Sequence, residues 1–420
     1  MTQKLKTVLA VIGLSAIAIV AADLLGRAAA SFDERYFETP RNVTLVDDDL
    51  RAALPAYDSV DYDPRTLLEE VRKSDRAVYQ PYTMWRRRAY RGEYTTIDVN
   101  SLRRTVGNSS QASALQVWMF GGSTVWGVGA PDDETIPSHL AKLLNDRFGI
   151  DANVRNLGER GFVSTQEVIY LMRELQAGRR PDVVLFYDGV NDAAAVSLWP
   201  EFPGAHVSYD TVRERFEAIN DDGGIGSLMR STGLYRASRI VLNRLEDDPF
   251  ERDGIIVYAS DDNDAEPDYD WLAERGIDLW LANARVVESL ARKYDFASLM
   301  FFQPGLWSDS KPLDPSEEML LTTEAEFASL KTVMRVRAEM ASALDAMLID
   351  SPVAKSVVNL HGLFADTSEP VYIDYVHITG RGNEIAAERI ASEMLKRLCL
   401  QPSADLNQKT LGQLRAGCQQ

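Results

Sequence analysis

Cysteine is scarce in this chain, which has only Cys399 and Cys418 among its 420 residues. Two cysteines are too few for a disulfide scaffold, and they exclude a cysteine-rich zinc site. Histidine is scarce as well, with four in the whole chain. Any chemistry that needs an imidazole ring therefore has few candidates.

Basic residues are also in short supply. The chain has 45 Lys and Arg against 63 Asp and Glu, which gives a net charge of −18. A surface this negative repels phosphates and excludes a general DNA- or RNA-binding protein. The content of hydrophobic residues (45%) and charged residues (26%) is ordinary for a globular protein and excludes a fibrous or wholly disordered chain. The length allows two or three domains, or one catalytic domain with additions.

An apolar run lies near the N-terminus. Lys4 and Lys6 precede sixteen uncharged residues, 7–22. This pattern predicts an export signal or, if it continues through Leu25, a membrane anchor. We expect residues 1–30 to remain as a single-pass anchor in the inner membrane, with the rest of the chain outside the cytoplasm. The alternative is cleavage at a small-residue site, which would give a secreted or periplasmic protein. In that oxidising compartment Cys399 and Cys418 either pair or remain free thiols.

Residues 31–112, here called the lead-in segment, show little apolar periodicity. They contain a cluster of aromatic residues and arginines at 85–91, with the sequence Trp-Arg-Arg-Arg-Ala-Tyr-Arg. Such a cluster is either a glycan or phosphate patch or a solvated strand edge that pairs with the acidic surface. We expect the solvated edge.

From residue 113 to 400, short apolar runs alternate with helical segments. This alternation predicts an α/β domain of three layers and flavodoxin-like type, with a five-stranded parallel sheet between helices. We expect an insertion between the third and fourth strands, at about 195–275, and a C-terminal tail at 401–420. The expected strands are 117–120, 154–157, 182–187, 297–302 and 356–360, and the expected helices are 136–144, 166–175, 279–293 and 384–398.

Polar motifs follow three of these strands and precede the last helix. Ser123 lies in Phe-Gly-Gly-Ser-Thr directly after the first strand, where a strand-to-helix turn would present it at the carboxyl edge of the sheet. Gly161 ends a block at 156–161 after the second strand, and Asn191 follows the third. The backbone N–H of Gly161, the side-chain amide of Asn191 and the N–H of Ser123 are candidate donors to an oxyanion. The alternative is that these are plain turn residues.

Asp374 and His377 are three residues apart, just before the last helix. This spacing lets the two side chains meet in one loop. Asp374 would then hold the Nδ1–H group of the ring, while Nε2 takes the proton of Ser123. The other three histidines have no comparable neighbour in the sequence.

Together the four motifs resemble the blocks of the SGNH, or GDSL-type, serine hydrolases over roughly 115–195 and 295–398. The first block departs from the family pattern, because Gly122 stands where the family has the aspartate of Gly-Asp-Ser. The resemblance implies that Ser123 is the nucleophile, His377 the base, Asp374 its partner, and Gly161 and Asn191 the oxyanion donors. It also implies that the enzyme cleaves carboxylic esters through an acyl-serine and needs no metal or other cofactor.

The substrate is less well defined than the reaction. We expect a serine esterase that acts on a small-molecule or glycan ester, with deacetylation of an O-acylated glycan as the first hypothesis. The second hypothesis is an O-acyltransferase that uses the same triad to modify a cell-envelope polysaccharide or exopolysaccharide. The third is a non-catalytic glycan-binding or assembly module, which the presence of all four motifs disfavours. The expected membrane contact is through the N-terminal helix alone.

Overall fold

The structure is a computed structural model that describes residues 21, 23–25, 48–220, 266–307, 310–324, 328–349 and 351–398. The chain divides into two units, one made of 1–43 and 208–256 and the other of 44–207 and 257–420. In the first unit the structure describes helix α8 (Tyr209–Asn220) and the helical residues 21 and 23–25. Most of the expected N-terminal anchor, both cysteines and the 401–420 tail lie outside the described residues. None of the helices within the described ranges has the length and apolar character needed to cross a membrane.

The second unit contains a five-stranded parallel sheet, as the sequence predicts. Its strands are β5 (Leu115–Gly121), β6 (Ala152–Asn156), β7 (Val183–Asp188), β8 (Ala297–Phe302) and β9 (Val357–Asn359). Their order across the sheet is β6-β5-β7-β8-β9, and every neighbouring pair is parallel. Numbered along the chain, this is the 2-1-3-4-5 order of flavodoxin-like folds. The first strand therefore lies between the second and third, so the loops after these three strands are neighbours at one edge.

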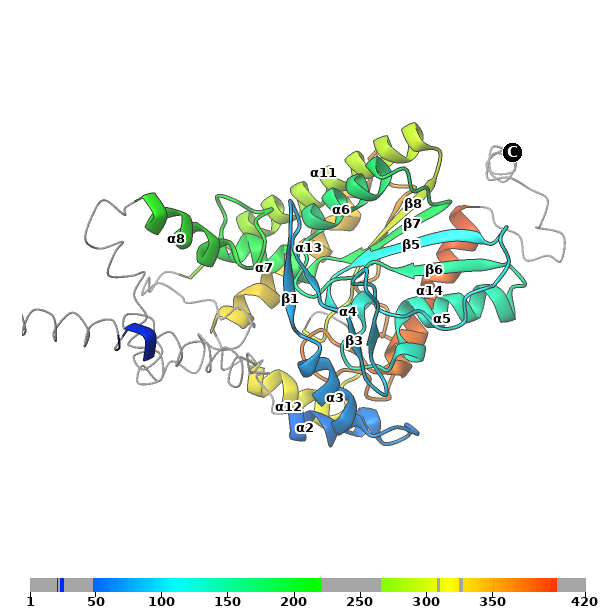
Figure 1. The fold of residues 1–420 in the computed structure, drawn as a ribbon, viewed down its shortest axis with the longest axis horizontal. Helices are drawn as coiled ribbons and strands as arrows, with labels where there is room; N and C mark the ends of the chain where they lie inside the picture. Colours follow the sequence, from blue (N-terminus) through cyan, green and yellow to red (C-terminus); the bar gives the residue numbers. More distant parts are fainter. Residues whose placement is uncertain are drawn as a thin grey trace, which may run out of the picture. The chain divides into compact units, whose positions relative to one another are not determined.

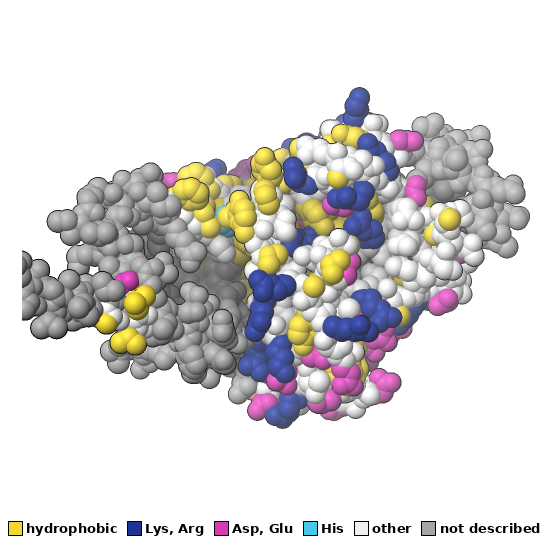
Figure 2. All heavy atoms as spheres, in the orientation of Figure 1, with side chains coloured by type: hydrophobic (Ala, Val, Ile, Leu, Met, Phe, Trp, Pro, Cys, Tyr) yellow, Lys and Arg dark blue, Asp and Glu magenta, His cyan; other side chains and the backbone are white. Residues whose placement is uncertain are grey.

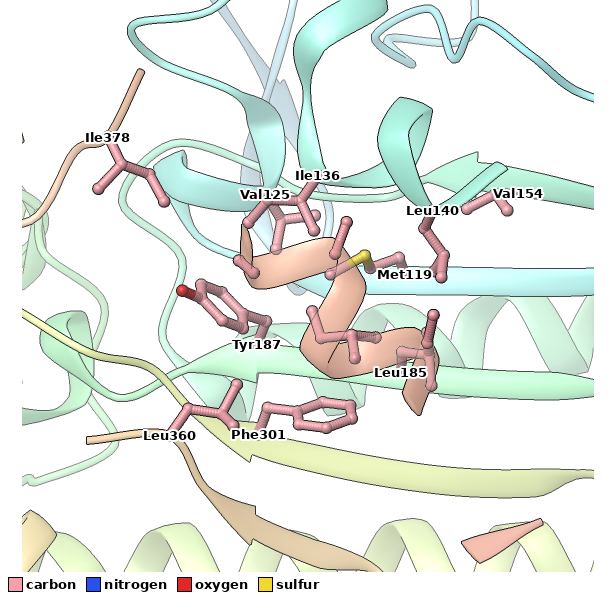
Figure 3. Packing of buried hydrophobic residues seen from close by; sticks show 14 of the residues in the cluster. Met119, Val125, Ile136, Leu140, Val154, Leu185, Tyr187, Phe301, Leu360 and Ile378 are labelled. Carbon is pink, nitrogen blue, oxygen red and sulfur yellow. The ribbon is translucent and has the colours of Figure 1, made fainter. Parts of the chain in front are cut away.

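Helices cover both faces of the sheet and make three layers (Figure 1). Side chains alternate along the strands: in β7, Val183, Leu185 and Tyr187 join the core on one face, whereas Val184 and Phe186 join the core on the other. The first core packs under α5 (Ile136–Lys142) and α14 (Gly380–Arg397), as the close view in Figure 3 shows. The helices of the second core are α6 (Ser164–Gln176), α7 (Val190–Leu198), α11 (Tyr269–Tyr294) and α13 (Ala328–Leu348).

The remaining described elements of this unit are short or peripheral. A four-residue helix, α4 (Ser123–Trp126), follows β5; a 3-10 turn, η2 (Asp132–Glu134), precedes α5; and a π-helical turn, η3 (Leu143–Arg147), follows it. Helix α12 (Pro315–Glu324) follows β8. The expected insertion is shorter than 195–275, because α7 extends to Leu198 and α11 begins at Tyr269. Both helices belong to the core on one face of the sheet.

The lead-in segment is more ordered than its sequence suggests. It contains α2 (Asp48–Ala52), η1 (Pro55–Tyr57), α3 (Pro64–Lys73) and two antiparallel strand pairs, β1 (Ala77–Gln80) with β2 (Met84–Arg87) and β3 (Tyr90–Arg91) with β4 (Thr96–Ile97). Lys and Arg side chains gather on the face of these elements seen in Figure 2. Arg88 and Arg91 are exposed, as a solvated strand edge requires. For Arg86 and Arg87 the expectation is wrong, because both are buried and pair with the fully buried Glu159.

Three buried carboxyl groups hold helices α6, α7 and α11 against the end of β7. Asp192 accepts hydrogen bonds from the backbone N–H (3.1 Å) and the hydroxyl (2.5 Å) of Ser164, and the indole N–H of Trp280 donates to Asp188. Both oxygens of Glu167 and Oδ2 of Asp188 have no donor among the described residues. One proton shared between the two carboxyl groups would supply a missing donor, and burial raises the pKa of both Glu167 and Asp188.

This arrangement predicts a pH-dependent stability. Burial, followed by the charge of Asp192, raises the pKa of Asp188 to about 8. The native state therefore keeps a proton that the unfolded chain loses above about pH 4, and the free energy of unfolding falls as the pH rises from about 4 to 8. In Asp188→Asn this slope is expected to be shallower, by up to about 1.4 kcal/mol per pH unit. The measurement is urea unfolding of the purified chain at several pH values.

Asp278→Asn is the control for this prediction, since Asp278 is an exposed aspartate on α11. The free energy of unfolding of this variant should change with pH in the same way as that of the unchanged protein. Parallel curves for the unchanged protein and Asp188→Asn would contradict the shared proton.

Candidate active site

The turn after β5 places Ser123 at the carboxyl edge of the sheet. The strand ends at Gly121, and Ser123 is the first residue of α4, so the chain changes from strand to helix within two residues. The Ser123 side chain is half-buried. It therefore lies at the surface where a ligand of a parallel sheet is expected.

The imidazole of His377 meets the hydroxyl of Ser123 across 254 residues of sequence. The distance from Nε2 of His377 to Oγ of Ser123 is 2.7 Å, and the distance from Nδ1 to Oδ2 of Asp374 is also 2.7 Å. An ionised carboxylate can only accept, so Nδ1 carries the ring proton and Nε2 is left to accept from the hydroxyl. The structure thus brings Ser123, His377 and Asp374 together in one hydrogen-bonded chain.

A narrow hairpin-like loop explains why the spacing of three places Asp374 beside His377. Tyr372 and Ile378 form an antiparallel bridge, and the N–H of Ile373 donates to the carbonyl of His377 at 2.9 Å. Inside this loop Oδ1 of Asp374 accepts from the backbone N–H groups of Val376 (3.0 Å) and His377 (2.7 Å). Its own loop therefore holds one oxygen of the carboxylate, Oδ1, and leaves Oδ2 to face the imidazole.

The environment of Asp374 keeps it charged. Its side chain is only 13% exposed, and this burial by itself raises the pKa of the carboxyl group. His377, the guanidinium of Arg51 and the hydrogen bonds of the loop outweigh burial and hold the pKa of Asp374 well below its usual range. Asp374 is thus a carboxylate at any pH near neutrality.

Three N–H groups are candidate donors to an oxyanion, those of Asn191, Gly161 and Ser123 itself. The amide of Asn191, in the first turn of α7, donates one N–H to the carbonyl of Phe162 at 2.7 Å and has a second N–H left. Gly161 has a φ of +77°, a conformation that favours glycine, and is half-buried. The N–H groups of Gly161 and Ser123 meet no acceptor among the described residues. Gly158, the other glycine of this block, instead allows close packing, because a Cβ there would lie 2.5 Å from the backbone nitrogen of Trp126.

Gly122 lies against the side-chain amide of Asn191. A Cβ at this position would lie 2.7 Å from Nδ2 of Asn191. A side chain at this position would displace that amide, which also donates to the Phe162 carbonyl. Gly122 and Asn191 therefore form a matched pair in this chain.

Sequence reasoning missed the residues that support the glycine loop. Glu159 is fully buried, and its carboxylate accepts from the backbone N–H groups of Arg87 and Arg160, both at 3.0 Å. It also pairs with the guanidinium groups of Arg86 (3.1 Å) and Arg87 (3.2 Å). Nearby, the indole N–H of Trp85 donates to the carbonyl of Arg160 at 3.0 Å. The lead-in segment thus holds the loop that carries Gly161.

A third buried arginine of the lead-in segment supports the helix of the serine. Arg103 donates to the carbonyls of Trp126 (3.2 Å), Gly127 (2.5 Å) and Ala130 (2.7 Å), and pairs with Asp132 at 3.1 Å. It satisfies carbonyls at the end of α4 that the short helix leaves without partners. The Arg103–Arg104 pair carries no sequence signal for this role.

The other histidines lie elsewhere, and no metal site accompanies the triad in the described part of the chain. His139 is within α5, His361 follows β9, and His206 packs edge-on against Trp85 at 5.8 Å between ring centres. Across the described ranges, no three His, Cys, Asp or Glu side chains are grouped so that they could hold a metal ion.

Gly122→Ala is expected to fold and to lose activity. The new methyl group would push the Asn191 amide away from Ser123, and loss of one preorganised donor lowers kcat by about 100- to 1000-fold with KM little changed. Steady-state kinetics with a small chromogenic ester measure the effect. Gly362→Ala is the matched control, because the nearest atom to its Cβ would be 3.9 Å away. Equal kinetics for both variants would show that Asn191 has no part in turnover.

Comparisons with known proteins return structural neighbours only. No family model and no curated protein matches the chain. One neighbour is a member of the lipolytic protein G-D-S-L family from Veillonella parvula, with 11% identity and a TM-score of 0.33 over 67% of this chain and 97% of that one. A G-D-S-L family protein described as a putative lipolytic protein, from Desulfitobacterium hafniense, has 10% identity and a TM-score of 0.31 over 66% and 98%. An acetylxylan esterase from Geobacillus stearothermophilus has 14% identity and a TM-score of 0.28 over 69% and 95%.

Proposed function

We propose that this protein is a serine esterase that hydrolyses carboxylic esters through an acyl-serine intermediate. The observation that carries the proposal is the continuous hydrogen-bonded chain from Ser123 through His377 to Asp374, with 2.7 Å at each step. A hydroxyl, an imidazole and a carboxylate in this order are the parts that activate a serine nucleophile.

In the proposed reaction Nε2 of His377 takes the proton of Ser123 as Oγ forms a bond to the ester carbonyl carbon. The negative charge that develops on the carbonyl oxygen is stabilised by N–H groups of Ser123, Gly161 and Asn191. The imidazolium, stabilised by Asp374, then returns its proton to the alcohol as the ester C–O bond breaks. In the second half, water loses a proton to His377 and attacks the acyl-serine, which releases the carboxylic acid and restores Ser123.

We further propose that the chain is an SGNH-type hydrolase that removes acetyl groups from an O-acylated glycan outside the cytoplasm. The support is the four motifs in their chain order and the apolar run behind Lys4 and Lys6. Hydrolysis is preferred to acyl transfer because it needs only water as acceptor. The half-buried position of Ser123 allows water to reach it.

The nucleophile can be tested by covalent labelling of the full-length chain with a fluorophosphonate probe. The unchanged protein is expected to be labelled on Ser123, and Ser123→Ala to lose the label, since the probe phosphonylates only an activated hydroxyl. Ser109→Ala is the control for an ordinary serine, whose hydroxyl hydrogen-bonds to Asp151. Equal labelling of Ser123→Ala and the unchanged protein would refute the serine assignment.

The acceptor can be tested with an acetylated polysaccharide in the presence and absence of an unacetylated oligosaccharide. Hydrolysis predicts acetate release at the same rate in both cases and no acylated oligosaccharide in the product. Mass spectrometry of the oligosaccharide and an acetate assay measure the two products. An acylated oligosaccharide formed at the expense of acetate would instead identify a transferase.

A further inference from the structure

The lead-in segment reaches the triad through Arg51. This residue lies on α2, and its guanidinium Nη2 is 2.6 Å from Oδ2 of Asp374, 323 positions later in the chain. Nε of the same side chain donates to the carbonyl of Ile373 at 3.3 Å. Arg51 is 3% exposed, so its charge is withdrawn from water together with the carboxylate that it meets.

We propose that Arg51 is a positioning residue for the reaction, which fixes the Asp374 carboxylate and limits how strongly this carboxylate stabilises a protonated His377. The proposal rests on the proposed esterase function. It assigns to the lead-in segment a direct part in setting the pH range in which the base is free to act.

One oxygen atom of Asp374 joins Arg51 to His377. Oδ2 of Asp374 accepts from Nη2 of Arg51 at 2.6 Å and from Nδ1 of His377 at 2.7 Å. The guanidinium and the imidazole are therefore no further apart than the sum of these two distances. At such a separation, away from bulk water, two positive charges repel each other appreciably. Arg51 is always charged, so it opposes the positive charge that His377 gains when it takes the proton of Ser123.

The second donation, from Nε of Arg51 to the Ile373 carbonyl, fixes the direction of the guanidinium. It holds the residue before Asp374 as well as the carboxylate itself. A planar group with several donors can do both at once, whereas a lysine ammonium on a flexible stem cannot. The position of Oδ2 relative to the imidazole thus depends on Arg51.

Other charged and titratable groups surround this contact. Asp48 on α2 lies 3.7 Å from Nη1 of Arg51 and is 29% exposed, so solvent weakens its effect. Tyr57 of η1 is buried and donates to the carbonyl of Gly129; burial raises its pKa, which keeps it neutral. Glu134 of η2 acts on Tyr57, and the ring of Tyr375 is 6.5 Å from that of His377. Among these groups, Arg51 is the cation that contacts the Asp374 carboxylate alongside the imidazole of His377.

The test is an NMR titration of the histidine rings in the full-length protein, followed through 13C labels. Only four histidines are present, and His377→Gln identifies the signal. In Arg51→Gln, which keeps a donor but removes the charge, the pH at which the His377 signal is half-shifted should rise by about 1–2 pH units. Arg51→Lys keeps the charge, so its midpoint should stay within about 0.3 pH units of the unchanged protein.

Kinetics give a second readout. The acidic limb of the pH profile of kcat/KM for a chromogenic ester should move upward with the NMR midpoint in Arg51→Gln. In Arg51→Lys the acidic limb of the pH profile should stay in place. The plateau value of kcat should fall by about tenfold with KM little changed, because a lysine lacks the planar, forked donors of the guanidinium. Arg65→Gln is the control, an arginine of the lead-in segment with 63% side-chain exposure that pairs with Asp49, and neither readout should change.

The outcomes separate a positioning role from a merely structural one. If Arg51→Gln is folded and its His377 midpoint is unchanged, the proposal is overturned. If Arg51→Gln does not fold, Arg51→Lys decides alone, because a midpoint displaced by a full pH unit there would contradict the charge effect. The NMR titration needs no turnover, so an inactive protein with the expected shift would count against the esterase function and leave the Arg51–His377 coupling supported.

Discussion

The candidate site depends on keeping one carboxylate charged in a place almost closed to water. Asp374 is 13% exposed, and desolvation alone would favour its protonated form. Two backbone N–H groups, the imidazole of His377 and the guanidinium of Arg51 supply enough compensation to reverse that tendency. Because the carboxylate stays ionised and fixed, the imidazole keeps one tautomer and one orientation toward Ser123.

Buried arginines of the lead-in segment make similar charge-compensating contacts at three places around the site. Arg51 meets Asp374, Arg86 and Arg87 meet Glu159 in the loop that carries Gly161, and Arg103 meets the carbonyls that end α4. Each cation is buried with an acid or with carbonyl oxygens, and removing one partner of such a pair leaves an uncompensated charge. Although the net charge of the chain is negative, a set of positively charged side chains is buried around the site. The segment before the sheet is structurally part of the site.

The sheet order explains how the loops meet. Since β5 lies between β6 and β7, the turn with Ser123, the loop with Gly161 and the start of α7 with Asn191 all leave adjacent strands at one edge. The loop with Asp374 and His377 follows β9, at the other end of the strand order. A contact between the N–H of Leu306, after β8, and the carbonyl of Tyr375 ties that loop to the same edge.

Local sequence determined the five strands of the parallel sheet, the four helices α5, α6, α11 and α14, and the motifs with Ser123, Asn191 and the Asp374–His377 pair. These features depend on periodicity and on spacings of a few residues, which the chain carries wherever it folds. Tertiary structure alone decided that Arg86 and Arg87 are buried, that Gly122 leaves room for Asn191, and that Arg51 reaches Asp374. Each of these contacts joins residues tens to hundreds of positions apart. Their energy comes from desolvated charge and close packing, and neither exists until the distant segments have met.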